Sequence, residues 1–179
     1  MMKMNTNNYE RICVIPGTFD PVTNGHLDLI KRTLKMFDKI YVVSFENSAK
    51  KTMFDDIERL EMLKLACGDI EDIKDINGMN KIEIDATNEL LVDYAKSKNA
   101  GFIIKGIRNS SDYEYEYSMF LINREIGNDR NDIETVLLPA KSEHLYISST
   151  FVREMIKYKR DISKYVPEKV NKFIISRFD

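Results

Sequence analysis

Two separated segments of the sequence combine small and hydroxyl residues in a way that suits phosphate binding. In PGTFDPVTNGH (residues 16–26), Gly17 lets a ligand approach the backbone closely, and Thr18 offers an amide and a hydroxyl as donors. In ISSTFVR (residues 147–153), hydroxyl residues open a predicted helix and Arg153 follows one turn later. Free amides at a helix start attract anions, so both segments predict contacts to phosphate. An ordinary turn at Gly17 and simple capping by the hydroxyls are the alternatives.

Charged side chains close to these segments could neutralise bound phosphates. His26 is predicted in the first turn of a helix, where a positive charge is unfavourable unless an anion binds beside it; a capping or core histidine is the alternative. Lys50 follows the second predicted strand and Arg108 the fourth, at the sheet edge where α/β proteins bind ligands. Taken alone, either would be read as a solvated surface cation. His144 lies in a polar turn and is predicted to have no role.

The elements that must position these residues alternate between strand and helix. Short β-branched runs bounded by turn residues predict strands, and apolar residues at helical spacing predict helices. In the second helix, Asp55 and Glu58 have the spacing of a capping box, and an apolar face is predicted at Ile57, Leu60 and Leu63. The predicted strands are residues 11–15, 40–44, 82–84, 102–104 and 135–138, and the other predicted helices are residues 26–36, 89–97, 112–126 and 150–157, with one more after Pro167.

Strands that alternate with helices need crossover connections, which produce a parallel sheet. We therefore predict a Rossmann-like α/β fold: a single domain with a five-stranded parallel sheet and helices on both faces. The domain is expected to span residues 11–179, after a polar, Asn-rich extension at residues 1–10 that is expected to be loosely ordered. Cys13 and Cys67 fall within predicted elements without the spacing of zinc ligands, and are predicted to be reduced core residues.

Composition and charge limit the classes of partner. The formal net charge of −2 argues against a grip on nucleic acid, which needs a basic surface. The sequence shows neither the apolar region of a signal peptide nor an apolar run of about 20 residues, the length of a membrane span. We therefore expect a cytoplasmic protein that binds neither nucleic acid nor membrane, and that holds any anionic ligand with a local cluster of residues.

Three motifs in order along the chain resemble those of a known enzyme family. PGTFDPVTNGH and ISSTFVR are similar to the paired signatures of the HxGH nucleotidyltransferase superfamily, with Thr23 in place of the first histidine. GIRNSSDYEYEYSM (residues 106–119) resembles the phosphopantetheine adenylyltransferases, which convert ATP and 4'-phosphopantetheine to dephospho-coenzyme A and pyrophosphate. The resemblance covers about residues 12–167. It implies a homohexamer and coenzyme A as a feedback inhibitor. Mg²⁺ is expected as cofactor, because it would neutralise the triphosphate of ATP through substrate oxygens.

Position by position, the resemblance implies roles for individual residues. It assigns catalysis to Thr18, His26 and Lys50. Lys105 stands where the family generally has arginine, so this position keeps the positive charge but loses the two-pronged contact to phosphate. Glu89 stands where many members have glycine. The implied ATP-binding residues are Gly17, Thr18, Phe19, His26, Gly106, Arg108, Glu116, Ser148, Ser149 and Thr150, and those implied for phosphopantetheine are Thr18, Lys50, Leu90, Leu91, Lys105 and Tyr115.

Two other functions have to be distinguished from this one. Another member of the superfamily, such as a glycerol-phosphate cytidylyltransferase or a nicotinamide-nucleotide adenylyltransferase, would share the fold, although the TNGH form and the DYEYEYSM run count against both. A non-catalytic nucleotide sensor on the same fold is the alternative from another class. The joint presence of Thr18, His26, Lys50 and Arg108 disfavours the sensor.

Overall fold

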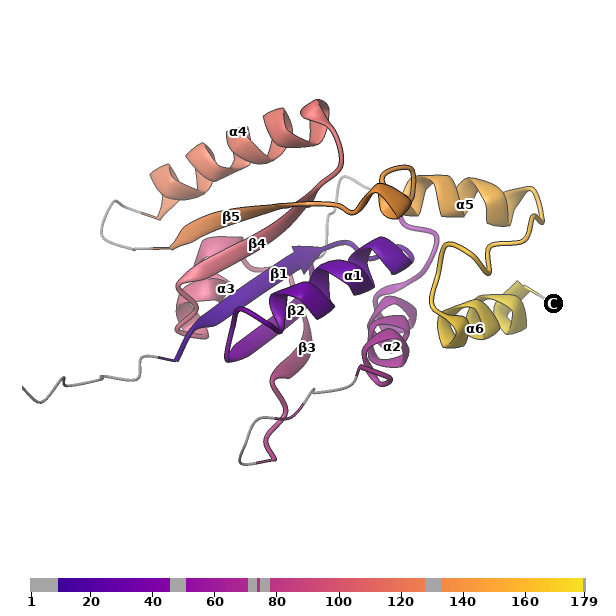
Figure 1. Ribbon diagram of the computed structural model, residues 1–179, viewed down its shortest axis with the longest axis horizontal. Coiled ribbons are helices and arrows are strands. Elements are labelled where there is room, and N and C mark those ends of the chain that lie inside the picture. The colour runs from indigo at the N-terminus through magenta and orange to yellow at the C-terminus, as the bar shows by residue number, and fades with distance from the viewer. Residues whose placement is uncertain (1–9, 46–50, 71–73, 75–77, 128–132, 179) are drawn as a thin grey trace, which may run out of the picture.

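The computed structural model describes residues 10–45, 51–70, 74, 78–127 and 133–178 (Figure 1). One sheet contains the five strands β1 (Ile12–Gly17), β2 (Lys39–Phe45), β3 (Ile82–Thr87), β4 (Phe102–Ile107) and β5 (Glu134–Pro139) in the order β3-β2-β1-β4-β5. Every neighbouring pair of strands is parallel. The predicted five-stranded parallel sheet is confirmed.

Helices connect the strands and cover the sheet (Figure 1). They are α1 (Asn24–Thr33), α2 (Asp56–Cys67), α3 (Leu91–Ser97), α4 (Ser110–Ile126), α5 (Ser149–Lys157) and α6 (Glu168–Phe178), and a short 3-10 helix that was not predicted lies at Ser142–His144. Side chains of Thr23, Asp55, Asn109 and Ser148 cap the first turns of α1, α2, α4 and α5, and the predicted capping box of Asp55 with Glu58 is confirmed. Within the described residues, no helix is long and apolar enough to cross a membrane.

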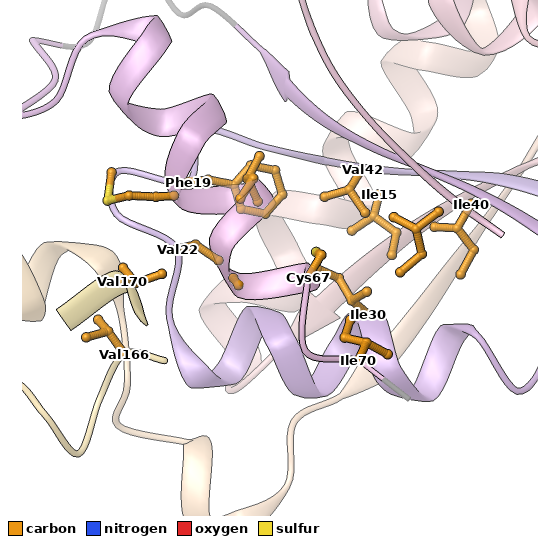
Figure 2. Close-up of a cluster of buried hydrophobic side chains, with 14 of the residues drawn as sticks. Ile15, Phe19, Val22, Ile30, Ile40, Val42, Cys67, Ile70, Val166 and Val170 are labelled. Atoms are coloured by element: carbon orange, nitrogen blue, oxygen red, sulfur yellow. The ribbon is translucent and has the colours of Figure 1, made fainter. Parts of the chain in front are cut away.

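Alternate side chains of β1 enter two cores on opposite faces of the sheet. Cys13 and Ile15 belong to the larger core, to which α1, α2, α5 and α6 contribute, and Figure 2 shows part of it. Val14 belongs to the smaller core, where it packs with Tyr94 of α3. The predicted helices on both faces are confirmed. Cys13 and Cys67 are buried, as predicted, and their burial raises the pKa of both thiols.

The buried face of α2 differs from the predicted one. Ile57 is 81% exposed, whereas Arg59 is only 2% exposed. Residues three and four apart share a face of a helix, so Arg59 lies on the same side as Met62 and Leu63, which are both buried. The prediction is therefore right for Leu63 and wrong for Ile57, and Leu60 is half-buried, because the buried face of α2 runs through Arg59 instead of Ile57.

Some element boundaries differ from the predicted ones in ways that matter for the site. β1 extends through Gly17 and β4 through Lys105 and Gly106, residues that the sequence suggested would lie in the loops after these strands. α1 begins at Asn24 rather than at His26. His26 remains in the first turn of its helix, as predicted, and becomes its third residue.

Candidate active site

A cleft of about 860 Å³ opens where the carboxyl ends of the strands meet the first turns of α1 and α5. Among the described residues with a predicted role, Leu90 does not line it, and its side chain is 55% exposed. Lys50 lies outside the described residues. The cleft brings together the remaining predicted residues: Gly17, Thr18, Phe19, His26, Leu91, Lys105, Gly106, Arg108, Tyr115, Glu116, Ser148, Ser149 and Thr150.

The orientation of the His26 ring is fixed by Thr23, the residue that caps α1. The amide nitrogen of Thr23 lies 3.0 Å from Nδ1 of His26, and the Thr23 hydroxyl lies 3.1 Å from the same atom. Phe19 packs against the imidazole edge to face, with ring centroids 5.1 Å apart. Thr23, which stands at the first histidine position of the superfamily signature, therefore caps the helix and orients His26.

The imidazole of His26 is neutral in the folded chain. Its burial, together with the positive charge of Arg108, lowers the pKa of His26 from 6.5 to about 4. The positive end of the α1 dipole acts in the same direction. A neutral ring whose Nδ1 accepts a hydrogen bond carries its proton on Nε2, from which it can donate to an anionic oxygen.

The backbone that follows β1 adopts a strained conformation. Phe19 has a φ of 51°, in the left-handed region that costs a non-glycine residue about 1–3 kcal/mol. Its ring lies over Gly17, where an added Cβ would come within 2.8 Å of Cζ of Phe19. Glycine at position 17 therefore makes room for the Phe19 ring, which in turn contacts His26.

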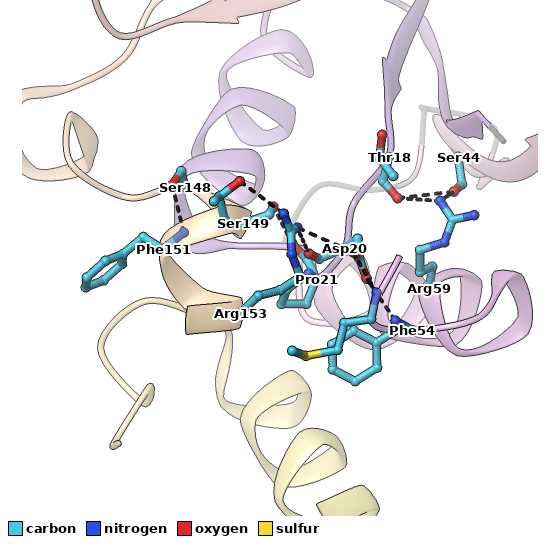
Figure 3. A network of polar contacts seen from close by, with 12 residues as sticks. Thr18, Asp20, Pro21, Ser44, Phe54, Arg59, Ser148, Ser149, Phe151 and Arg153 are labelled. Atoms are coloured by element: carbon cyan, nitrogen blue, oxygen red, sulfur yellow. Dashed lines mark hydrogen bonds and ion pairs between the residues drawn. The ribbon is translucent and has the colours of Figure 1, made fainter. Parts of the chain in front are cut away.

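Asp20 anchors the turn after Phe19. Its side chain is 3% exposed, and its carboxylate accepts hydrogen bonds from the amides of Met53 and Phe54 at 3.0 Å each (Figure 3). Arg153 of α5 lies 3.4 Å from the same carboxylate and also donates to the Asp20 carbonyl oxygen. The carboxylate of Asp20 thus joins the N-terminal motif to the C-terminal one.

A buried arginine that the sequence did not single out lies behind Thr18. Nη1 of Arg59 donates to the carbonyl oxygen of Thr18 at 2.6 Å and to the hydroxyl oxygen of Ser44 at 2.9 Å (Figure 3). Nη2 of Arg59 pairs with Asp56. The signal that could have revealed its burial is its spacing, four residues before the core residue Leu63.

Arg108 is held in place between α4 and the segment that leads into α5. Its Nε and Nη2 donate to the two carboxylate oxygens of Asp112 at 2.8 and 3.1 Å, and its Nη1 donates to the Ile147 carbonyl oxygen at 3.2 Å. The hydrogen-bonded guanidinium lowers the pKa of Asp112, which keeps the pair ionised. Arg108 therefore presents a fixed positive charge at the cleft wall, close enough to affect His26.

Lys105 of β4 pairs with Glu116 of α4. The Lys105 ammonium lies 3.2 Å from a carboxylate oxygen of Glu116, with side chains 22% and 15% exposed. The resemblance assigned these two residues to different substrates, but the structure brings them into contact. A phosphate that binds the Lys105 ammonium therefore has to share it with the Glu116 carboxylate.

The start of α5 leaves backbone donors for a ligand while its hydroxyls bind protein groups. The Ser148 hydroxyl caps the Phe151 amide at 3.0 Å, and the Ser149 hydroxyl donates to the Pro21 carbonyl oxygen at 2.8 Å (Figure 3). The Thr150 hydroxyl accepts from Arg153 at 3.0 Å. The first amides of a helix have no partner within it, and those of Ser149 and Thr150 have none among the described residues. They can therefore bind phosphate oxygens.

His144 belongs to the cleft wall, although the sequence suggested no role for it. Its side chain is 16% exposed, and Nε2 lies 3.5 Å from a carboxylate oxygen of Glu143. Nδ1 is buried and has no hydrogen-bond partner among the described residues. The sequence around His144 has no pattern that predicts an element. The 3-10 helix that carries it is only three residues long.

The chain is similar to known nucleotidyltransferases in sequence and in fold. The cytidylyltransferase-like family matches residues 14–155. A phosphopantetheine adenylyltransferase of Nautilia profundicola is 43% identical over 159 residues, which cover 89% of this chain and 96% of that protein. One of Clostridium beijerinckii is 40% identical over 169 residues, which cover 94% and 99%.

The fold of the chain is also found in a solved structure. Plasmodium falciparum nicotinic acid mononucleotide adenylyltransferase complexed with APC superposes with a TM-score of 0.69 at 17% identity, covering 95% of this chain and 96% of that one. The Rossmann-like fold is thereby confirmed, and the sequence relatives, which match the chain over almost its whole length, define the family more narrowly. The chain belongs to the phosphopantetheine adenylyltransferase family.

Proposed function

We propose that the cleft transfers the adenylyl group of ATP to 4'-phosphopantetheine, which gives dephospho-coenzyme A and pyrophosphate. The observation that carries this proposal is the convergence of phosphate donors on one cleft: the Nε2–H of His26, the guanidinium of Arg108 and the first amides of α5. Relatives that are 40–44% identical bear the name of this enzyme.

The acceptor phosphate supplies the nucleophile, so the chain need not provide one. A phosphate oxygen of 4'-phosphopantetheine attacks the α-phosphorus of ATP in line. The bond from this phosphorus to the oxygen that bridges to the β-phosphorus then breaks, and pyrophosphate leaves with the electron pair. The residues of the cleft contribute positioning and stabilisation of negative charge.

On the reacting phosphates we assign three side chains. The Nε2–H of His26 donates to the ATP phosphates as charge develops, and the Thr18 hydroxyl orients the attacking oxygen. Lys50, assigned from the sequence, bridges the donor and acceptor phosphates. The remaining ATP contacts are assigned to Gly17, Phe19, Gly106, Arg108, Ser148, Ser149 and Thr150, with Glu116 toward the ribose and adenine.

On the acceptor side we assign Leu91 and Tyr115, which both line the cleft, to the uncharged pantetheine arm. Lys105, which lines the same cleft, is assigned to the acceptor phosphate while it remains paired with Glu116. Leu90 is assigned to the arm from the sequence alone, since its exposed side chain does not line the cleft.

Mg²⁺ is the proposed cofactor. Among the described residues, no group of three or more His, Cys, Asp and Glu side chains could hold a metal, and the carboxylate of Asp20 is already bound by two amides and Arg153. The described residues therefore do not provide a set of protein ligands for Mg²⁺. We therefore assign its ligands to the phosphate oxygens of ATP, whose charge it neutralises.

The proposed enzyme is a cytoplasmic homohexamer that coenzyme A inhibits. The assembly is supported by α4, a helix of 17 residues with no buried residue, on which Tyr117 and Leu121 are 47% and 49% exposed. Exposed apolar patches often mark surfaces that another chain covers. Light scattering should give six times the 20.9 kDa of one chain. Coenzyme A contains the chemical groups of both substrates, so we expect it to compete with them.

A pyrophosphate-release assay tests the activity. ATP and 4'-phosphopantetheine should give pyrophosphate, and His26→Ala should lower the rate roughly a hundred- to thousandfold, as expected for removal of one transition-state donor. CTP with glycerol phosphate, and ATP with nicotinamide mononucleotide, serve as controls. Turnover with a control pair alone would assign the chain another substrate, and tight ATP binding without pyrophosphate release would make it a sensor.

A further inference from the structure

Arg59 is a charged side chain that the adenylyl-transfer mechanism does not use, although it lies directly behind the site. It is 2% exposed and does not line the cleft. Its Nη1 holds the Thr18 carbonyl oxygen at 2.6 Å, and the Ser44 hydroxyl lies 3.4 Å from the same oxygen (Figure 3). Residues of α2 and β2 thus converge on a single peptide group at the end of β1.

This peptide group joins two residues that line the cleft, Thr18 and Phe19. In a trans peptide the carbonyl and the following N–H point in opposite directions. The Thr18 carbonyl points at Arg59, so the Phe19 N–H points away from it. The Phe19 amide has no hydrogen-bond partner among the described residues, although Phe19 itself is 3% exposed.

We propose that Arg59 is a positioning residue for adenylyl transfer, which holds the Thr18–Phe19 peptide so that the Phe19 N–H donates to a phosphate in the cleft. The positive charge on the carbonyl side polarises the peptide, because hydrogen bonds in a chain strengthen one another. The same contact fixes the backbone of Thr18 and keeps Phe19 in its left-handed conformation. This inference rests on the proposed function.

A purely structural role explains the contacts of Arg59 less well. Its Nε is buried without a hydrogen-bond partner among the described residues. Buried polar groups are normally paired, and an apolar side chain of similar volume often stabilises a core as well as a buried ion pair does. A residue kept for packing alone would not need a hydrogen bond to the peptide that leads into the strained residue Phe19.

Three variants separate positioning from packing. Arg59→Met removes the contact and the charge, whereas Arg59→Lys keeps the charge but offers one ammonium instead of a fork of donors. Met62→Ala is the matched control, because Met62 is buried on the same face of α2 and does not line the cleft. All are compared with wild type well below the melting temperature of the least stable variant.

Two readouts are used: kcat and KM with ATP and 4'-phosphopantetheine, and calorimetric binding of inorganic pyrophosphate. For Arg59→Met, kcat and pyrophosphate affinity should each fall roughly ten- to hundredfold, the range for losing a hydrogen bond to a charged group. Arg59→Lys should recover part of both losses. Met62→Ala should lower the melting temperature and leave both quantities within about twofold of wild type, because a cavity in the core changes stability and not the donors.

The inference is wrong if folded Arg59→Met keeps wild-type kcat and pyrophosphate affinity, or if Met62→Ala loses as much of both as Arg59→Met does. Should Arg59→Met not fold, Arg59→Lys is compared with Met62→Ala in the same way, and equal losses overturn the inference. The binding readout needs no acceptor substrate. Normal pyrophosphate binding by wild type without turnover would therefore refute the proposed function, while the binding data still decide the role of Arg59.

Discussion

The backbone amide of Thr23 donates a hydrogen bond to Nδ1 of His26 across 3.0 Å. An amide can only donate, so Nδ1 accepts and the proton of the neutral ring lies on Nε2. The contact also closes the capping box of α1, so the same atoms start the helix and set the tautomer of the imidazole. His26 is thus prepared as a neutral donor before any nucleotide binds.

The first prediction concerns the pKa of His26 in the free protein. Titration followed by NMR should give a value of about 4, well below 6.5, with the Nε2–H tautomer at neutral pH. The protein has two histidines, so a His144→Gln variant leaves one imidazole to follow. A His26 pKa near 6.5, or an Nδ1–H tautomer, would contradict the assigned hydrogen bond.

The lowered pKa also determines how stability changes with pH. Between about pH 6.5 and pH 4 the unfolded chain binds a proton on His26 and the folded chain does not, so the free energy of unfolding falls as the pH drops through this window. Urea denaturation at pH 7.5 and pH 5 should show a larger loss for wild type than for His26→Gln. Equal losses would show that His26 is not held neutral by the fold.

The second prediction concerns the coupling between Arg108 and His26. Arg108→Met should raise the pKa of His26 toward 6.5 and weaken ATP binding, because both depend on the positive charge at the cleft wall. Arg32→Met is the matched control: Arg32 also lines the cleft but does not contribute to the His26 pKa. NMR titration of both variants checks the pKa, and an unchanged pKa in Arg108→Met would show that burial alone lowers it.

The fold and the location of the site could be predicted from local patterns in the sequence. The alternation of strand and helix patterns predicted the parallel sheet. Hydroxyl or acidic residues predicted where several helices begin. The carboxyl ends of parallel strands meet at one edge of a sheet. Gly17, Arg108 and Ser149 therefore converge on one cleft although they lie far apart in the chain.

The contacts that hold this cleft together could not be predicted, because each joins residues that only the fold brings together. The Ser149 hydroxyl binds the Pro21 carbonyl across 128 positions of sequence, and Arg59 binds the Thr18 carbonyl across 41. Helical spacing predicted the buried face of α2 only in part, and it carries no information about which carbonyl a buried arginine contacts. His144 lies at the cleft on a short 3-10 helix, whose sequence has no strong local pattern from which it could be predicted.

The third prediction tests Lys105, which the proposal assigns to the acceptor phosphate. Lys105→Arg should lower KM for 4'-phosphopantetheine, because a guanidinium can contact Glu116 and a phosphate at once, whereas Lys105→Met should raise it. KM for ATP is the internal control and should change less. A higher KM for the acceptor in Lys105→Arg would contradict this prediction. It would show that the site with Glu116 binds the acceptor phosphate better with lysine than with arginine.

The fourth prediction separates the structural role of Asp20 from a role in metal binding. Asp20→Asn should lower the free energy of unfolding by about 1.5–3 kcal/mol, because it weakens hydrogen bonds from two amides and removes the ion pair with Arg153. Asp161→Asn, which alters an exposed carboxylate that caps Ser163, is the control and should change stability less. Urea denaturation at one protein concentration measures both, since assembly makes stability depend on concentration. The Mg²⁺ dependence of turnover should be unchanged in Asp20→Asn, and a higher Mg²⁺ requirement with unaltered stability would instead identify Asp20 as a metal-binding residue.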